Sequence, residues 1–173
     1  MATQDLLTYK CKSLGYAEVG AGAGASYTPL MGVLEGLSIS QETANESAIN
    51  GEFYDTPLDS VSTLGSYKIE FDLVKYKPEE IAAMEGGEFT AATGLYTMPS
   101  SFTNVYKQFK LEFYNGIDYI VIYKGKVATN WDGTDLKTAP LKLHIAITAL
   151  VDNDGKTVEM KMAEPSVGGK DPL

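Results

Sequence analysis

Residues 67–73 read Tyr67-Lys68-Ile69-Glu70-Phe71-Asp72-Leu73, an alternation of large apolar and charged side chains that determines the fold class. Successive side chains of a β-strand point to opposite faces, so this pattern predicts a strand with one face in a core and one toward water. The stretch Phe109-Lys110-Leu111-Glu112-Phe113 repeats the pattern and is followed by Asn115-Gly116, a strong hairpin signal. The charged members of both stretches are the candidate residues of a water-facing surface: Lys68, Glu70, Asp72, Lys110 and Glu112.

Five further stretches have strand patterns, so the chain as a whole is predicted to be mainly β. The run at 119–123 is apolar on both faces, and we expect neighbouring structure to cover it on both sides. The sequence Asp152-Asn153-Asp154-Gly155 predicts a turn between the last two strands. The further strands are expected at 6–16, 34–40, 119–123, 141–150 and 158–162.

One short helix is predicted to begin at Pro78 and to continue through Met84. Proline suits the first helical position, and the two glutamates that follow it suit the positive end of the helix dipole. The pair Gly86-Gly87 permits the left-handed conformation that ends a helix. At about two turns the helix is too short to be stable alone, so we expect Ile81 and Met84 to pack on a sheet.

Three stretches predict irregular structure. Residues 20–26 alternate glycine with alanine and indicate a flexible link. Residues 41–66 form a polar span rich in Ser and Thr, and a loop of that length inside a compact domain is usually functional. Proline and glycine in 163–173 predict a flexible tail after a single domain over 1–162. The expected fold is therefore a β-sandwich with one short α-helix and a long loop.

The composition favours a folded chain in a reducing cytoplasm. Of 173 residues, 44% are hydrophobic and 21% are charged, which is typical of globular rather than disordered proteins. No apolar run approaches the roughly 20 residues of a membrane helix, and residues 1–5 lack the basic and apolar segments of a secretory leader. We therefore expect no membrane anchor. Cys11 is the single cysteine and cannot form an internal disulfide.

The charge balance argues against sequence-specific binding of nucleic acid. The net charge is −9, from 23 acids and 14 bases, and every base is lysine. Lysine lacks the planar fork with which arginine reads guanine edges and holds phosphates. A negative protein also repels the phosphate backbone.

The sequence does not complete the residue patterns of the catalytic and cofactor sites considered below. His144 is the only histidine, so multi-histidine metal sites are excluded and a catalytic triad would depend on it alone. It falls on the polar side of its strand, where a partly exposed histidine is the plainer interpretation. The glycines of 20–24 are not followed by the helix of a dinucleotide site, and 152–155 lacks EF-hand spacing. We expect no enzyme, metal or cofactor, although the many carboxylates leave a paired-acid glycosidase open.

The order of these features resembles the major tail tube proteins of tailed bacteriophages. A glycine-rich early segment leads through 27–33 into 37–42, and the long polar loop follows. The strand, acidic helix and double glycine of 67–87 come next and carry the resemblance best. Three strands and the turn at 152–155 complete an order that covers approximately residues 5–160.

The resemblance implies a structural protein of the virion tail, assembled in the host cytoplasm. Proteins of this family form homohexameric rings that stack into a tube through which the genome passes. The implied partners are other copies of the chain, other tail proteins, and viral DNA that passes without sequence-specific binding. One water-facing surface would line the channel, with Lys68, Glu70 and Asp72, together with Lys110 and Glu112, as the candidate residues.

The resemblance also implies a role for the long loop, which in this family reaches a neighbouring subunit. We expect it to be mobile in the free monomer and ordered by assembly, with Phe53, Tyr54 and Leu58 as its anchors. Two alternatives stay open. One is a tail terminator or baseplate ring protein of the same fold. The other is a carbohydrate-binding β-sandwich, in which some of the 11 tyrosines and Trp131 would stack on sugars.

Overall fold

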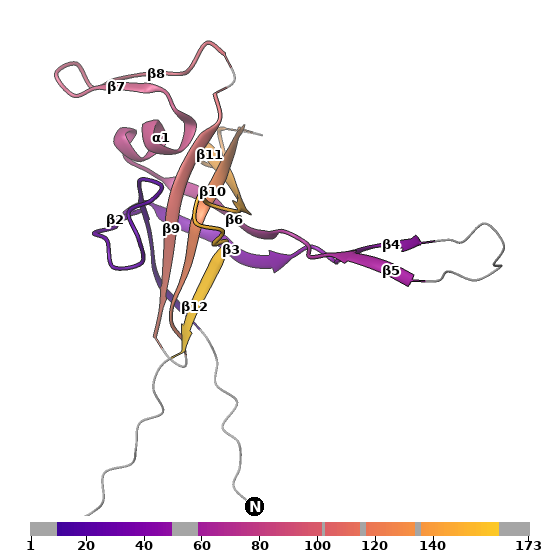
Figure 1. Cartoon of the computed structure of the whole chain (residues 1–173). Helices are drawn as coiled ribbons and strands as arrows, with labels where there is room; N and C mark the ends of the chain where they lie inside the picture. Colours follow the sequence, from indigo (N-terminus) through magenta and orange to yellow (C-terminus); the bar gives the residue numbers. More distant parts are fainter. Residues whose placement is uncertain (1–9, 50–58, 102, 115–116, 134–135, 163–173) are drawn as a thin grey trace, which may run out of the picture. The chain divides into compact units, whose positions relative to one another are not determined.

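Strands dominate the computed structural model, which describes residues 10–49, 59–101, 103–114, 117–133 and 136–162 (Figure 1). One helix and twelve strands with antiparallel pairing occur in these ranges, which confirms the mainly β fold class. The elements are β1 (Cys11–Ala17), β2 (Thr28–Pro29), β3 (Val33–Gln41), β4 (Asn45–Ile49), β5 (Asp59–Thr63), β6 (Tyr67–Lys75), α1 (Pro78–Glu85), β7 (Glu88–Thr90), β8 (Leu95–Thr97), β9 (Val105–Phe113), β10 (Ile117–Asp132), β11 (Lys142–Leu150) and β12 (Val158–Met162).

Contacts within the chain form two compact units. Unit 1 contains the residues up to Leu30, Lys107–Lys124 and the residues from Val151 onward. Unit 2 contains Met31–Tyr106 and Gly125–Leu150. The strand β10 contributes its first half to unit 1 and its second half to unit 2. The single domain over 1–162 stays a prediction.

In unit 1 the hydrogen-bonded strands follow the order β2-β1-β9-β10, and β12 also pairs with β10. Leu14 of β1 lies opposite Leu111 of β9 on the buried face. The alternate pairs, which include Gly15 opposite Lys110, share the other face. Residues 120–123 of β10 are all buried, so the expected cover on both faces is confirmed.

In unit 2 the order is β10-β11-β6-β3. The alternation of apolar and charged residues over 67–73 holds along β6, where Ile69, Phe71 and Leu73 are at most 1% exposed. Leu143, Ile145 and Ile147 lie directly opposite them on β11 and are also buried. Burial of such side chains contributes about 1.5–3 kcal/mol each, so these two central strands hold unit 2 together.

The helix α1 forms where the sequence predicts it. Ile81 and Met84 are buried as expected, and Gly86 ends the helix in the left-handed conformation at φ 81°. The acidic residue Glu80 is also buried, because its carboxylate accepts backbone hydrogen bonds from Lys77, Met31 and Gly32. At eight residues α1 is short, and no helix in the described ranges is long and apolar enough to cross a membrane.

A two-stranded ribbon of β4 and β5 continues from the end of the β3–β6 pair, and we call its described residues, 42–49 and 59–66, the arm (Figure 1). The last pair of β3 and β6 is Gln41 opposite Tyr67, and the backbone N–H of Glu42 then donates to the carbonyl of Ser66 over 2.9 Å. Beyond this point β4 pairs only with β5, from Asn45 opposite Thr63 onward. The side chains at 46–49 are exposed.

The structure corrects several boundaries. The expectation of irregular structure over 41–66 is wrong at β4 and β5, and the hairpin of β7 and β8 was not predicted. The link at 20–26 takes a defined course, with turns closed by hydrogen bonds from Ala21 to Glu18 and from Ala25 to Gly22. The strand expected at 119–123 extends over all of β10, because burial continues to alternate from Tyr123 through Gly125 to Val127, with the half-buried Lys124 and Lys126 between them.

Candidate functional site

The charged side chains predicted on β6 stand on one side of this strand. Lys68, Glu70 and Asp72 are each half-buried, and Lys68 Nζ lies 4.0 Å from Glu70 Oε1. Directly opposed residues of antiparallel strands share a face, so this surface extends over β3 and β11. The cross-strand neighbours are Ser40 and Thr148 beside Lys68, Ser38 and Ala146 beside Glu70, and Glu35 and His144 beside Asp72.

A hydrogen bond to a histidine and an ion pair join the strands at one end of this polar surface. Nδ1 of His144 lies 2.7 Å from Oδ1 of Asp72, and Nζ of Lys142 donates to Oε2 of Glu35 over 2.8 Å. The hydrogen bond to Glu35 raises the pKa of Lys142, so this lysine stays charged. The acids Glu35 and Asp72 are direct cross-strand neighbours, and each also contacts a basic residue of β11, so this surface carries both acidic and basic groups.

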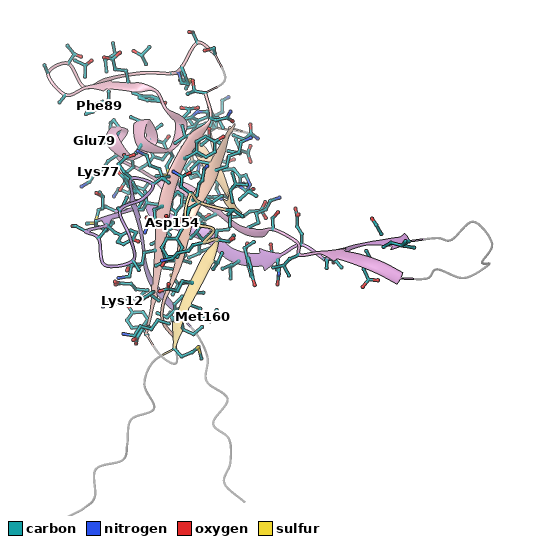
Figure 2. The ribbon with its side chains drawn as sticks, viewed as in Figure 1. Lys12, Lys77, Glu79, Phe89, Asp154 and Met160 are labelled. Atoms are coloured by element: carbon teal, nitrogen blue, oxygen red, sulfur yellow. The ribbon has the colours of Figure 1, made fainter. Side chains whose placement is uncertain are left out.

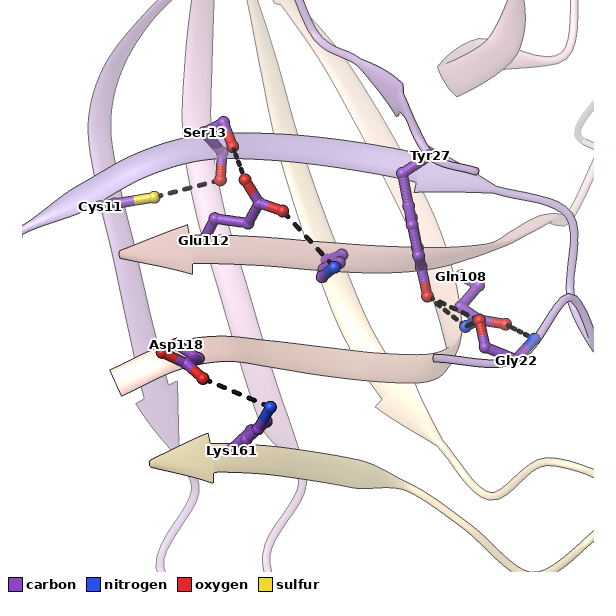
Figure 3. A network of polar contacts seen from close by, with 9 residues as sticks. Cys11, Ser13, Gly22, Tyr27, Gln108, Glu112, Asp118 and Lys161 are labelled. Atoms are coloured by element: carbon purple, nitrogen blue, oxygen red, sulfur yellow. Dashed lines mark hydrogen bonds and ion pairs between the residues drawn. The ribbon is translucent and has the colours of Figure 1, made fainter. Parts of the chain in front are cut away.

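The other two predicted surface residues, Lys110 and Glu112, belong to unit 1 and line a pocket. The pocket has a volume of about 220 Å³ and lies over β1 and β9. Ser13 Oγ donates to one oxygen of Glu112 over 3.2 Å, and Nζ of Lys110 lies 3.4 Å from the other (Figure 3). We call this the Tyr27 pocket; its lining residues are Ser13, Gly15, Ala25, Tyr27, Pro29, Lys110 and Glu112.

A buried amide fixes the wall of this pocket. Gln108 is fully buried on β9, and its Nε2 donates to the carbonyl of Gly22 over 2.9 Å and also to the hydroxyl of Tyr27 (Figure 3). Its Oε1 accepts the N–H of Gly22 over 3.3 Å. A buried side-chain amide with its polar groups satisfied holds its partners in one geometry. The glycine-alanine link is therefore attached to the sheet.

Aromatic rings and lysines continue from the pocket onto β10 and β12. Nζ of Lys110 lies 5.6 Å from the ring centre of Tyr27 and 4.8 Å from that of Tyr119. Lys161 of β12 lies 5.9 Å from the same Tyr119 ring and 3.5 Å from the carboxylate of Asp118 (Figure 3). Such cation–π contacts contribute about 0.5–1 kcal/mol at exposed positions. The lysines are thus held by rings as well as by acids.

Trp131, proposed above as a stacking residue, has partners within unit 2. Its Nε1 donates to Glu85 Oε1 over 3.0 Å, and its ring meets Tyr76 edge-on with centres 5.6 Å apart. The hydroxyl of Tyr96 donates to the other oxygen of Glu85, and burial together with this bond raises the pKa of Tyr96. This arrangement fixes the end of α1 against β10 and β8.

A glycine is required at the root of the arm. A Cβ placed on Gly65 would lie 1.9 Å from the carbonyl oxygen of Glu42, far inside contact distance. The close approach lets the chain leave the sheet as a two-stranded ribbon. The expected anchors Phe53, Tyr54 and Leu58 lie outside the described residues.

Within each unit, the structure brings predicted surface residues together. Lys68, Glu70 and Asp72 share one surface in unit 2, and Lys110 and Glu112 share a pocket in unit 1. Sequence reasoning missed Gln108 and Tyr27. The one local signal at position 108 was a polar side chain directly before the apolar Phe109. In the described ranges no three His, Cys, Asp or Glu side chains gather as a metal site would require.

No family model matches the chain, and a search of the curated proteins found no match.

Proposed function

We propose that this chain is a structural protein of a bacteriophage tail that assembles into stacked hexameric rings. The rings form the tail tube, the conduit for the genome. The order of features in the sequence supports this proposal through its resemblance to tail tube proteins. The mainly β fold with one short helix agrees with that resemblance.

The arm is the observation that carries the proposal. A two-stranded hairpin is marginally stable by itself in water, and the side chains at 46–49 are exposed, with Ile49 at 47%. In a monomer, the two described strands of this ribbon pair only with each other, so few contacts stabilise it. It gains apolar and backbone contacts if it lies against another copy of the chain. Assembly would therefore provide the contacts that stabilise the arm.

Microscopy of the purified chain, with and without the arm, tests the proposal. We expect negative-stain images of the full chain to show tubes of uniform width. A variant without residues 46–59 should keep the β-sheet circular dichroism and the cooperative melting of the full chain but should remain unassembled. The deletion leaves β3 and β6 intact, so loss of tubes would report the arm rather than unfolding.

Three outcomes would contradict the proposal or shift it. A full chain that stays monomeric at high concentration and salt would overturn it. Tubes of normal width from the deletion variant would remove the arm as the assembly element. Single rings that never stack would favour the alternative of a tail terminator or baseplate ring protein.

A further inference from the structure

The Tyr27 pocket has a wall that hydrogen bonds within unit 1 hold in place, and its lining includes Lys110 and Glu112, two of the candidate residues of the channel surface. Gly15 is one of its lining residues, and a Cβ at this position would lie 3.0 Å from Cβ of Tyr27 and 3.3 Å from the carbonyl of Thr28. A larger residue at position 15 would push the segment with Tyr27 away from β1 by a few tenths of an ångström. The buried Gln108 then fixes the ring by its hydroxyl. A site built in this way does not lose entropy by ordering its wall when a ligand binds.

The polar groups at the mouth offer both donors and acceptors. One oxygen of Glu112 accepts a hydrogen bond from Ser13, the other lies 3.4 Å from Nζ of Lys110, and each carboxylate oxygen has two lone pairs. The ammonium of Lys110 has three N–H donors that a ligand could use. Ser13 donates its hydroxyl proton and keeps lone pairs free to accept. Ligand groups that both donate and accept suit this set.

The charge of the lining and the volume of the pocket limit the class of ligand further. Lys110 and Glu112 neutralise each other, so an ionic ligand would gain little net attraction. The volume of about 220 Å³ is below the roughly 300–1,000 Å³ of sites for drug-sized molecules, which points to a single ring. Tyr27 and Pro29 supply an apolar wall for C–H groups.

We infer that the Tyr27 pocket binds a neutral polyhydroxyl ring, that is, a monosaccharide unit or the terminal sugar of a glycan. The C–H groups of the sugar pack on Tyr27 and Pro29, and its hydroxyls bond Glu112, Lys110 and Ser13. The site lies wholly within unit 1, so the inference does not depend on the proposed tail tube.

Saturation-transfer NMR on the full chain tests the inference with three probes: methyl glucoside, methyl galactoside and N-acetylglucosamine. The method works for monomers and tubes alike, because it observes the ligand. We expect transfer to the ring C–H protons of at least one sugar, with millimolar affinity, as is typical of a single small site. Glu112→Gln should weaken this affinity about tenfold, equivalent to about 1.4 kcal/mol. Tyr27→Ala should abolish the transfer.

Matched variants separate binding from folding. Tyr114→Ala removes another exposed tyrosine of unit 1 that does not line the pocket, and should leave the transfer unchanged. Tyr27→Phe keeps the ring but loses the bond to Gln108, and should retain weaker binding even if Tyr27→Ala melts early. No transfer to any of the three sugars would overturn the inference. So would transfer unaffected by Glu112→Gln, or binding of thymidine monophosphate in place of sugars.

Discussion

The hydrogen bond between Tyr123 and Glu159 stabilises the fold at neutral pH and is lost at alkaline pH. It joins β10 to β12 over 2.7 Å, and this bond, with burial, raises the pKa of Tyr123 to about 12. The phenol donates only while protonated, so its contribution is complete below the ordinary tyrosine pKa of about 10. The contribution is lost as the pH rises through the folded value of about 12.

We therefore predict that the free energy of unfolding falls between pH about 10 and about 12. Tyr123→Phe should cost about 1 kcal/mol at pH 8 and should reduce this alkaline loss, because the phenylalanine cannot ionise. Urea denaturation across the pH range measures both effects. Tyr114→Phe, at an exposed position, is the matched control. Equal alkaline losses in wild type and Tyr123→Phe would contradict the assignment.

Glu80 holds three backbone N–H groups and cannot be replaced by its amide. Oε1 faces the N–H groups of Met31 and Gly32, and Oε2 faces that of Lys77. Glutamine would turn an NH₂ group toward at least one of these donors. We predict that Glu80→Gln lowers the free energy of unfolding by about 1–3 kcal/mol, measured by urea titration. The exposed neighbour Glu79 is the control, since Glu79→Gln should change stability by less than about 0.5 kcal/mol.

Residues whose role follows from alternation could be predicted, and residues whose role follows from distant partners could not. Period-two patterning places Lys68 and Lys110 on polar faces because the rule acts within one strand. Gln108 instead bonds Gly22, which is 86 residues away along the chain. Glu80 likewise bonds Met31, 49 residues away. Local sequence carries no signal for such pairings, so the pocket wall emerged only from the structure.

At the scale of elements, the root of the arm requires a glycine at position 65. Gly65→Ala would place a methyl group against the carbonyl of Glu42, so β3, β6 or the arm must shift. We predict a cost of about 1–3 kcal/mol, typical of overpacking, and a loss of tubes in negative-stain images. Gly24→Ala is the control, because its added Cβ would meet open space. Normal stability and normal tubes in Gly65→Ala would contradict the requirement.

The elements that sequence reasoning missed share a physical cause. The strand β4 reads Asn-Glu-Ser-Ala-Ile and its residues 46–49 are exposed, so no buried face imposes an alternation. By contrast, β6 and β11 each bury one face and could be predicted almost to their ends. The helix was predicted correctly because Pro78 and Gly86 mark its two ends.

At the scale of the whole molecule, negative charge is unevenly divided. The described residues of unit 1 carry seven lysines and six acids, whereas those of unit 2 carry six lysines and eleven acids. The segment 42–66, which belongs to unit 2, contributes to this asymmetry, because its sequence contains five acids and no lysine. Copies of a chain with a net charge of −9 repel one another until salt screens them.

We predict that assembly accelerates as ionic strength rises from about 0.01 M to about 0.15 M, because the screening length shortens from about 30 Å to about 8 Å. Light scattering at fixed protein concentration measures the rate. Melting curves at both salt concentrations check that the subunit itself is unchanged. A rate that falls with salt would contradict the prediction and would show instead that opposite charges attract across the contact between copies.

The continuity of β10 has a consequence for how the chain folds. Its first half is aligned by β12 within unit 1, and its second half by β11 within unit 2. A slip of one residue along a strand turns every side chain to the opposite face. Lys124 and Gly125 are consecutive residues of one strand, so neither unit ends in a loop at this point. A slip of the first half against β12 would expose the apolar side chains that this half buries in unit 1, and a slip of the second half against β11 would do the same in unit 2.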